Sequence, residues 1–171
     1  VVALSPLTGS VMDCNVGGYF GPLLKFAGWD AIEIQGKAQR DVVVYIDGNK
    51  GRITIEEAPG LSIDSYPVGE EALAMFAESD AERRDVSSVS AGTGAEHSLF
   101  GCLNFSWYDT RRQRVRMKQA GRGGIGTVFR DKRLKALVVK KSGVTAESNR
   151  PADPQAVREA GLKVHREMHD L

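Results

Sequence analysis

The sequence QAGRGGIG at residues 119–126 opens a short helical stretch, which leads into the apolar strand KALVVK at residues 135–140. An earlier segment has the same order: NVGGYFG at residues 15–21 leads through a short helix into the apolar run AIEIQ at residues 31–35. Glycine permits positive φ and lets bare N–H groups approach a ligand, and the following helix points its positive end at the same place. Two such turns predict a site for two phosphates, or for one ligand with two phosphate arms.

The two segments form a weak internal repeat with an offset of about 106 residues, from Gly17 to Gly123. Such a duplication usually relates equivalent loops by a pseudo-two-fold axis. We therefore expect Gly17, Gly18, Gly123 and Gly124 to lie on one shared face. Neither loop fits the Gly-x-Gly-x-x-Gly dinucleotide pattern or the P-loop pattern, so both of those folds are disfavoured. Because a glycine pair before a helix is common, a purely structural turn is the alternative for each loop.

The composition excludes several classes of protein. With 171 residues, 42% hydrophobic and 26% charged, the chain resembles an ordinary soluble domain with one core. A net charge of +1 gives no reason to expect nucleic acid. No apolar run approaches the roughly 20 residues of a membrane span and no signal peptide is visible, so we expect a cytoplasmic protein. Basic residues cluster before and within the second loop, which suits an anionic ligand or a solvated strand equally: Arg111, Arg112, Arg114, Arg116, Lys118 and Arg122.

The cysteines and histidines give no metal or catalytic motif. We expect Cys14 and Cys102 to be buried thiols, because two cysteines at this spacing form neither a disulfide framework nor a cluster site. His165 and His169 have the i, i+4 spacing of two metal ligands, but no third ligand is evident and a solvated surface is favoured. His97 could reach a site or be structural. No nucleophile elbow, triad order or carboxylate pair is visible, so the chain resembles a cofactor cradle.

Alternation and turn residues predict the secondary structure and the domain organisation. A helix is expected at residues 68–79, and a hairpin at 42–56. Residues 141–154 resemble a linker and the remainder a helix of a following domain, which divides the chain into 1–145 and 146–171, part of a longer polypeptide. The expected strands are residues 1–4, 31–35, 42–46, 52–56, 86–91, 99–107, 114–118 and 135–140.

Six motifs occur in a fixed order along the chain: SPLTG (5–9), NVGGYFG (15–21), LKFAGWD (24–30), GTGAE (92–96), AGRGGIG (120–126) and LKALV (134–138). Together they resemble the N-terminal domain of the tungsten-containing aldehyde:ferredoxin oxidoreductase family, from residue 1 to about residue 141. The resemblance implies an α+β fold in which two related β-sheet halves with pseudo-two-fold symmetry form a saddle for a cofactor.

The resemblance also implies the cofactor and its ligands. A tungsten bis-pyranopterin (tungstopterin) is expected on the saddle, with its phosphates meeting at a Mg²⁺ ion that the backbone carbonyls of Asn15 and Ala120 ligate; magnesium prefers oxygen ligands of this kind. Arg122 is expected beside the phosphates, with a salt bridge to Asp131 or Glu96 as the alternative. The expected cofactor-binding residues are Asn15, Val16, Gly17, Gly18, Ala120, Gly121, Arg122, Gly123 and Gly124.

The implied activity is oxidation of aldehydes to carboxylic acids, with electrons passed through a 4Fe-4S cluster to ferredoxin or an iron–sulfur partner subunit, in a homo-oligomer or hetero-oligomer. In the family the cluster cysteines lie downstream, so this chain is not expected to be active alone. The alternatives are the tungsten subunit of a benzoyl-CoA reductase-type enzyme, whose first loop lacks the asparagine found at Asn15, and a non-catalytic phosphate-binding module. Two features depart from the family pattern: Thr93 replaces a usual proline, and residues 104–116 are longer and more basic than expected.

Overall fold

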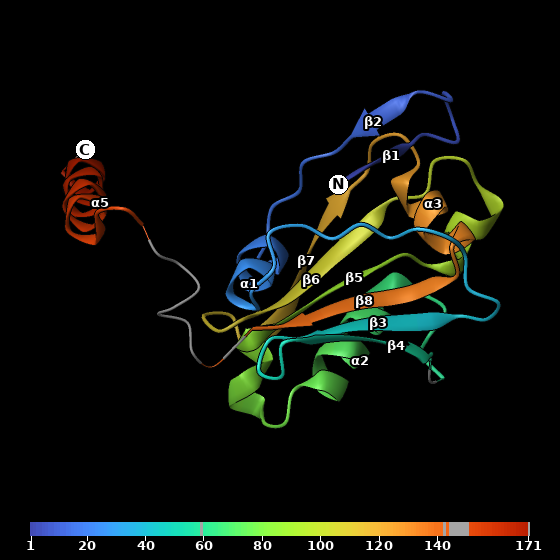
Figure 1. The fold of residues 1–171 in the computed structure, drawn as a ribbon, viewed down its shortest axis with the longest axis horizontal. Coiled ribbons are helices and arrows are strands. Elements are labelled where there is room, and N and C mark those ends of the chain that lie inside the picture. Colours follow the sequence, from blue (N-terminus) through green and yellow to red (C-terminus); the bar gives the residue numbers. More distant parts are fainter. Residues whose placement is uncertain (59, 142, 144–150, 171) are drawn as a thin grey trace.

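A mixed six-stranded β-sheet forms the centre of the molecule (Figure 1). The computed structural model describes residues 1–58, 60–141, 143 and 151–170. A separate two-stranded ribbon consists of β1 (Val2–Leu4) and β2 (Val11–Asp13). The strands of the large sheet are β3 (Val42–Asp47), β4 (Arg52–Glu57), β5 (Val86–Ser90), β6 (Leu103–Asp109), β7 (Arg114–Ala120) and β8 (Leu134–Lys140).

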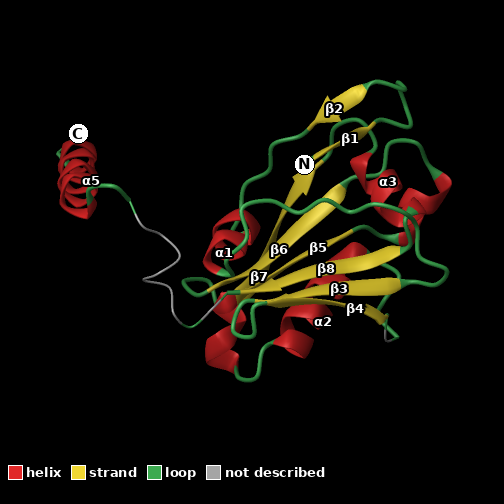
Figure 2. Cartoon of the chain, viewed as in Figure 1, coloured by secondary structure: helices red, strands yellow, loops and turns green. Residues whose placement is uncertain are grey.

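The strand order in the large sheet is β4-β3-β8-β5-β6-β7. Strands β3 and β8 are parallel, and all the other neighbouring pairs are antiparallel. Helices α1 (Phe20–Phe26) and α3 (Ile125–Asp131) cover one face together with the ribbon, and α2 (Ser65–Phe76) covers the other (Figure 2). The remaining elements are the 3₁₀ turns η1 (Asp80–Asp85) and η2 (Thr93–His97) and helix α5 (Pro154–His169), which has no buried residue.

The apolar central strands explain why the core lies on both sides of the sheet. Val43 and Val138 point into the core beneath α2, whereas Val44 and Val139 belong to the core beneath α1 and α3. A strand that is apolar on both faces is typical of the buried centre of a sheet. The predicted hairpin is confirmed, with Val44 opposite Ile55.

Helix α2 begins earlier than the sequence pattern predicts, at residue 65 and not 68. The Asp64 side chain caps it by accepting a hydrogen bond from the backbone N–H of Tyr66 at 3.0 Å. Pro67 was expected to precede the helix, but it lies within the first turn, where proline needs no N–H partner. Gly69 packs directly over Ser106, so this helix approaches the sheet closely.

Two of the predicted strands are wrong in part. Residues 31–35 form no strand, although Ile32 and Ile34 pack against the core as their alternation indicated. Residues 99–102 precede β6, which begins only at Leu103. The described strands form one large sheet and one ribbon, so two halves related by pseudo-two-fold symmetry stay a prediction. The predicted domain boundary at residue 145 lies outside the described residues.

None of the helices within the described parts of the chain is long and apolar enough to span a bilayer.

Candidate functional site

The first glycine loop leaves the end of β2 and enters α1. Its start is fixed where the backbone N–H of Cys14 donates to the Val1 carbonyl at 2.9 Å. Beyond that point Asn15, Gly17 and Gly18 are exposed, and Val16 packs against the core. Gly18 has φ of 108°, and a Cβ there would lie 3.0 Å from the Trp107 ring. Glycine is therefore required at Gly18 by both backbone conformation and packing.

The second glycine loop leaves the end of β7 and enters α3. Ala120 is fully buried and pairs with Leu103 across the sheet. Gly123 and Gly124 have φ of 69° and 74°. A Cβ on Gly124 would lie 2.1 Å from the carbonyl oxygen of Leu99, which is a severe clash. The second loop is thus packed tightly against the rest of the domain.

The two loops meet at the β1–β2 ribbon. A Cβ on Gly123 would lie 2.4 Å from Cγ of Met12, a residue of β2. Met12 precedes Asn15 by three residues, a span of about 10 Å in extended chain. The second loop therefore packs on the same strand that delivers the first loop.

At two positions in these loops, neither the backbone conformation nor the packing of the domain requires glycine. Neither Gly17 nor Gly121 has a positive φ. A Cβ on Gly17 would meet nothing within 4 Å, and one on Gly121 would only touch Cys102 at 3.9 Å. Both residues are exposed. Since neither backbone strain nor packing requires glycine at these two positions, their bare backbone is suited to close approach by a ligand.

Arg122 lies between the glycines of the second loop and is exposed. The alternative expected from the sequence, a salt bridge from Arg122 to Asp131 or Glu96, is not formed. Each of these carboxylates pairs with a different basic residue. Asp131 bonds Lys37 at 2.7 Å, and Glu96 bonds Arg130. Within the described residues, no ion pair compensates the Arg122 guanidinium, which leaves it available to an anion.

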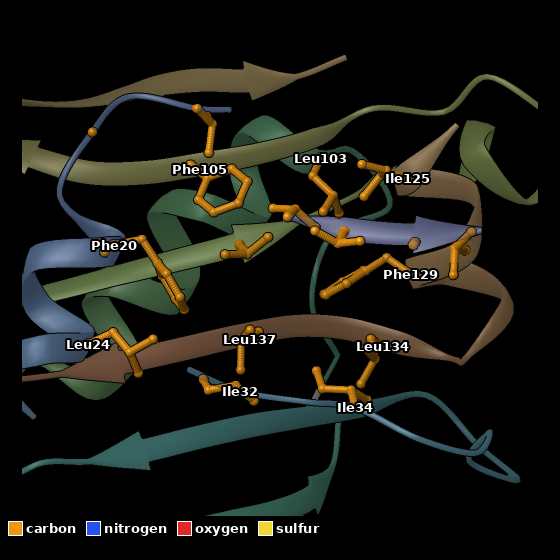
Figure 3. Close-up of a pocket in the computed structure, with 18 of the residues that line it drawn as sticks. Phe20, Leu24, Ile32, Ile34, Leu103, Phe105, Ile125, Phe129, Leu134 and Leu137 are labelled. Atoms are coloured by element: carbon orange, nitrogen blue, oxygen red, sulfur yellow. The ribbon is translucent and has the colours of Figure 1, made fainter. Parts of the chain in front are cut away.

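An apolar cavity of about 430 Å³ lies beneath the first loop (Figure 3). Gly17 and Gly18 line one side, and Ile125, which follows the second loop, lines another. Phe20, Ile32 and Leu137 point into it. Burying a phosphate among such side chains would carry a large desolvation cost, so this cavity is no phosphate site. An anionic ligand fits the exposed side of the loops instead.

An ion cluster around the buried side chain of Arg130 anchors the helix that follows the second loop. The Arg130 side chain is only 3% exposed, and it donates to Asp41 at 2.8 Å, to Glu96 and to the Leu134 carbonyl at 2.8 Å. Burial by itself lowers the pKa of Arg130, but the hydrogen bonds to Asp41 and Glu96 outweigh it and the pKa lies above its ordinary value. Sequence periodicity gave no sign of this cluster, because its members lie far apart in the chain.

The cysteines and histidines differ in part from expectation. Cys14 and Cys102 are free thiols, but they are half-buried and not buried as predicted, because each flanks an exposed glycine loop. His165 and His169 are exposed on α5, and His97 is exposed at the end of η2. No group of three or more metal-ligating side chains occurs in the described part of the chain.

Residues 1–141 match the family described as aldehyde ferredoxin oxidoreductase, N-terminal domain. The chain belongs to this family. The resemblance drawn from the six motifs is therefore confirmed.

Relatives of this aldehyde ferredoxin oxidoreductase domain include tungsten-containing aldehyde ferredoxin oxidoreductases of three archaea. Identity is 37% over 140 residues for Pyrococcus abyssi, 36% over 140 residues for Pyrococcus horikoshii and 35% over 160 residues for Pyrococcus furiosus. These alignments cover 82%, 82% and 93% of this chain, but only 21%, 21% and 24% of the relatives. The chain thus spans about a fifth to a quarter of the length of these enzymes.

A solved structure shares the fold of this aldehyde ferredoxin oxidoreductase domain. It is the active-site complex BamBC of benzoyl coenzyme A reductase with 1,5-dienoyl-CoA, which matches with a TM-score of 0.67 and 27% identity. The match covers 82% of this chain and 19% of that chain. The mixed sheet and the helices that cover it thus belong to the fold of this family.

Proposed function

We propose that this chain is the cofactor-binding domain of an oxidoreductase that oxidises aldehydes to carboxylic acids. Family membership and identity of 34–37% to four enzymes named tungsten-containing aldehyde ferredoxin oxidoreductases support this assignment. The bound cofactor, a tungsten bis-pyranopterin, would supply two-electron redox chemistry at the metal. The electrons would leave through a 4Fe-4S cluster held by downstream residues, to ferredoxin or to an iron–sulfur partner subunit.

The two glycine loops hold the cofactor phosphates in this proposal. The observation that carries it is the pair of solvent-facing glycines, Gly17 and Gly121, in loops that meet at one ribbon. Backbone N–H groups of Val16, Gly17 and Gly18 in the first loop would donate to one phosphate. Those of Gly121 to Gly124 would donate to the other, with the Arg122 guanidinium beside it.

A Mg²⁺ ion between the phosphates would take the backbone carbonyls of Asn15 and Ala120. The two carbonyls lie at or shortly after the ends of the strands that lead into the loops: Ala120 is the last residue of β7, and Asn15 lies two residues past β2. Oxygen-only coordination suits magnesium, and the phosphates supply the remaining charge. The chain's own contribution is thus positioning, by carbonyls and amides of fixed loops.

The alternative is a tungsten subunit of the benzoyl-CoA reductase type. The shared fold with the BamBC complex favours it, at 27% identity. The higher identity to the aldehyde enzymes and the presence of Asn15 favour the aldehyde reaction. A non-catalytic phosphate-binding module is the third possibility, and it requires no metal.

Elemental analysis of the full-length protein, joined to two assays, separates the three functions. We expect tungsten and magnesium in the purified protein, and aldehyde-dependent reduction of ferredoxin or of a viologen dye. Tungsten with ring reduction of benzoyl-CoA, and no aldehyde oxidation, would assign the chain to the alternative enzyme. A protein that contains no tungsten after growth with tungstate would be the non-catalytic module.

A further inference from the structure

A second hollow opens between the β6–β7 hairpin turn and helix α1, next to Tyr19 at the end of the first glycine loop. Its volume is about 660 Å³, within the range of small-molecule pockets. Only two of the side chains that line it are acidic, Asp85 and Asp109, and five are basic. The lining therefore carries an excess of three positive charges, whereas the whole chain has a net charge of +1. The basic residues are Arg84, Arg111, Arg112, Arg116 and Lys141.

Asp109 organises the basic residues at the hairpin turn. Its carboxylate accepts from the backbone N–H groups of Arg111 and Arg112 at 3.0 and 3.1 Å. The Arg112 guanidinium donates to it at 3.0 Å, and Arg116 lies 3.5 Å away. Partial burial raises the pKa of Asp109, but the bonds from Arg112 and Arg111 outweigh it, so the pKa lies below its ordinary value. One carboxylate thus holds two arginines in place.

The positive charge exceeds what the carboxylates can neutralise. Asp85 is already shared by Lys141 at 3.0 Å and Arg84 at 3.8 Å. The Arg111 side chain forms no ion pair within the described residues, and it is exposed at the turn. Like charges gathered in one hollow repel one another, so an anion bound among them would be stabilised by all of them.

Aromatic rings form one wall of the hollow. Tyr19 and Trp107 both line it, and their ring centroids are 5.9 Å apart. Trp107 is 7% exposed and fixed in the core, whereas Tyr19 is 56% exposed. An exposed ring held by a buried ring provides a flat surface on which a planar group can stack.

We propose that this hollow binds a phosphate-bearing small molecule with a planar ring, of the nucleoside diphosphate class. The arginine forks at the hairpin turn match phosphate oxygens in a bidentate way. The planar ring lies against Tyr19. A concave site of this volume suits a small molecule, whereas an acidic protein partner would need a broader, flatter surface.

This hollow borders the first phosphate loop, because Tyr19 directly follows Gly18 and a Cβ on Gly18 would lie 3.0 Å from the Trp107 ring, whereas its arginines lie away from the second loop. Arg116 precedes Ala120 by four residues of β7, a span of about 13 Å along the strand. None of the residues assigned to the cofactor loops lines the hollow. A substitution at Arg111, on the arginine side of the hollow, therefore tests ligand binding here apart from cofactor binding.

Titration calorimetry of the full-length holoprotein with ADP tests the proposal. We expect saturable binding that weakens at high salt, with pyrophosphate and adenosine each binding at least about tenfold more weakly than ADP. Arg111→Ala should weaken ADP binding about tenfold or more, because a charge-assisted contact is lost. The tungsten content of that variant should equal that of the wild type.

Arg114→Ala is the matched control, since Arg114 is exposed on the same hairpin but does not line the hollow. ADP affinity should change less than about twofold in this variant. No heat of binding with ADP would overturn the proposal, as would equal losses in the two variants. Pyrophosphate binding as tightly as ADP would remove the role of Tyr19. Loss of tungsten in Arg111→Ala would show that the hollow belongs to the cofactor site instead.

Discussion

The two glycine loops have similar sequences, but the domain holds them differently. In the second loop, Ala120 and Gly124 are buried, and Gly123 and Gly124 are crowded by Met12 and Leu99. In the first loop, Asn15 and Gly17 face solvent, and of Gly17 and Gly18 only Gly18 has a close neighbour. A glycine pair in a sequence can thus be required by tight packing, by close approach of a ligand, or by both. Structure separates the two causes, because it shows what a Cβ would meet.

The helices after the two loops repeat this contrast. Helix α3 is anchored by the buried guanidinium of Arg130 to Asp41 and Glu96, which are remote in sequence. Helix α1 is held by apolar packing of Leu23, and the ion pair between Lys25 and Asp30 beside it has side chains that are 52% and 81% exposed. An exposed pair of this kind contributes little to stability. The helix after the second loop is therefore anchored by buried charge, whereas the first loop and its helix are held by the ribbon, by Trp107 and by apolar packing.

The largest expected effect is that of Gly124→Ala on stability. A side chain at φ of 74° is strained, and its Cβ would lie 2.1 Å from the Leu99 carbonyl oxygen, so the loop must move. We expect a loss of about 3 kcal/mol or more in the free energy of unfolding. The measurement is the melting temperature and soluble yield of the full-length apoprotein from cells grown without tungsten. A melting temperature equal to that of the wild type would contradict the conclusion that the second loop is tightly packed at Gly124.

Gly17→Ala and Gly121→Ala should affect cofactor binding and not stability. Neither added methyl group meets a close neighbour, so the apoprotein should be as stable as the wild type, or more stable by about 0.4–1 kcal/mol. Cofactor affinity should fall about tenfold or more, since a methyl group interferes with phosphate contacts to the backbone. Tungsten and magnesium content per protein measures this loss. Full metal content in both variants would mean that neither glycine faces the cofactor.

The secondary structure could be predicted from the sequence only in part. The strands expected at residues 42–46 and 135–140 and the hairpin to β4 are confirmed, because apolar runs and turn residues are local signals. At residues 31–35 the alternation correctly predicted that Ile32 and Ile34 face the core, but the predicted strand is wrong. This segment packs on the core without pairing with another strand. Pairing partners depend on tertiary contacts, which local periodicity does not contain.

The candidate site was predictable only in part. The order of the motifs identified the family and both loops, which the match over residues 1–141 confirms. The roles of the individual loop residues stay predictions. The surplus charge around Asp109 was visible as a basic run, but the hollow was not, because Tyr19 and Arg84 come from distant parts of the chain.

A smaller effect is expected from Arg122→Ala. The guanidinium is exposed and no carboxylate neutralises it among the described residues, so its loss should leave the apoprotein's melting temperature nearly unchanged. Partial exposure also limits its contribution to phosphate binding to about 1 kcal/mol, or a several-fold loss of affinity. Cofactor occupancy at limiting tungstate during growth is the appropriate measurement. Arg133→Ala removes an exposed charge after α3 and serves as the control. A clear drop in apoprotein stability would show that Arg122 serves the fold.

The smallest effect concerns the exposed ion pair between Asp131 at the end of α3 and Lys37, at 2.7 Å. The hydrogen bond from Lys37 holds the pKa of Asp131 below its ordinary value of 3.8. A depressed carboxyl pKa contributes stability above the ordinary value, and the contribution disappears as the pH falls through the lower folded value. Asp131→Asn should therefore reduce stability slightly at pH 7, by less than about 1 kcal/mol because the Asp131 side chain is 69% exposed. Melting curves of wild type and variant should converge as the pH is lowered below 3.8. A difference that persists at low pH would show that the asparagine disturbs α3 by another route, and that the end of this helix is less tolerant than an exposed ion pair implies.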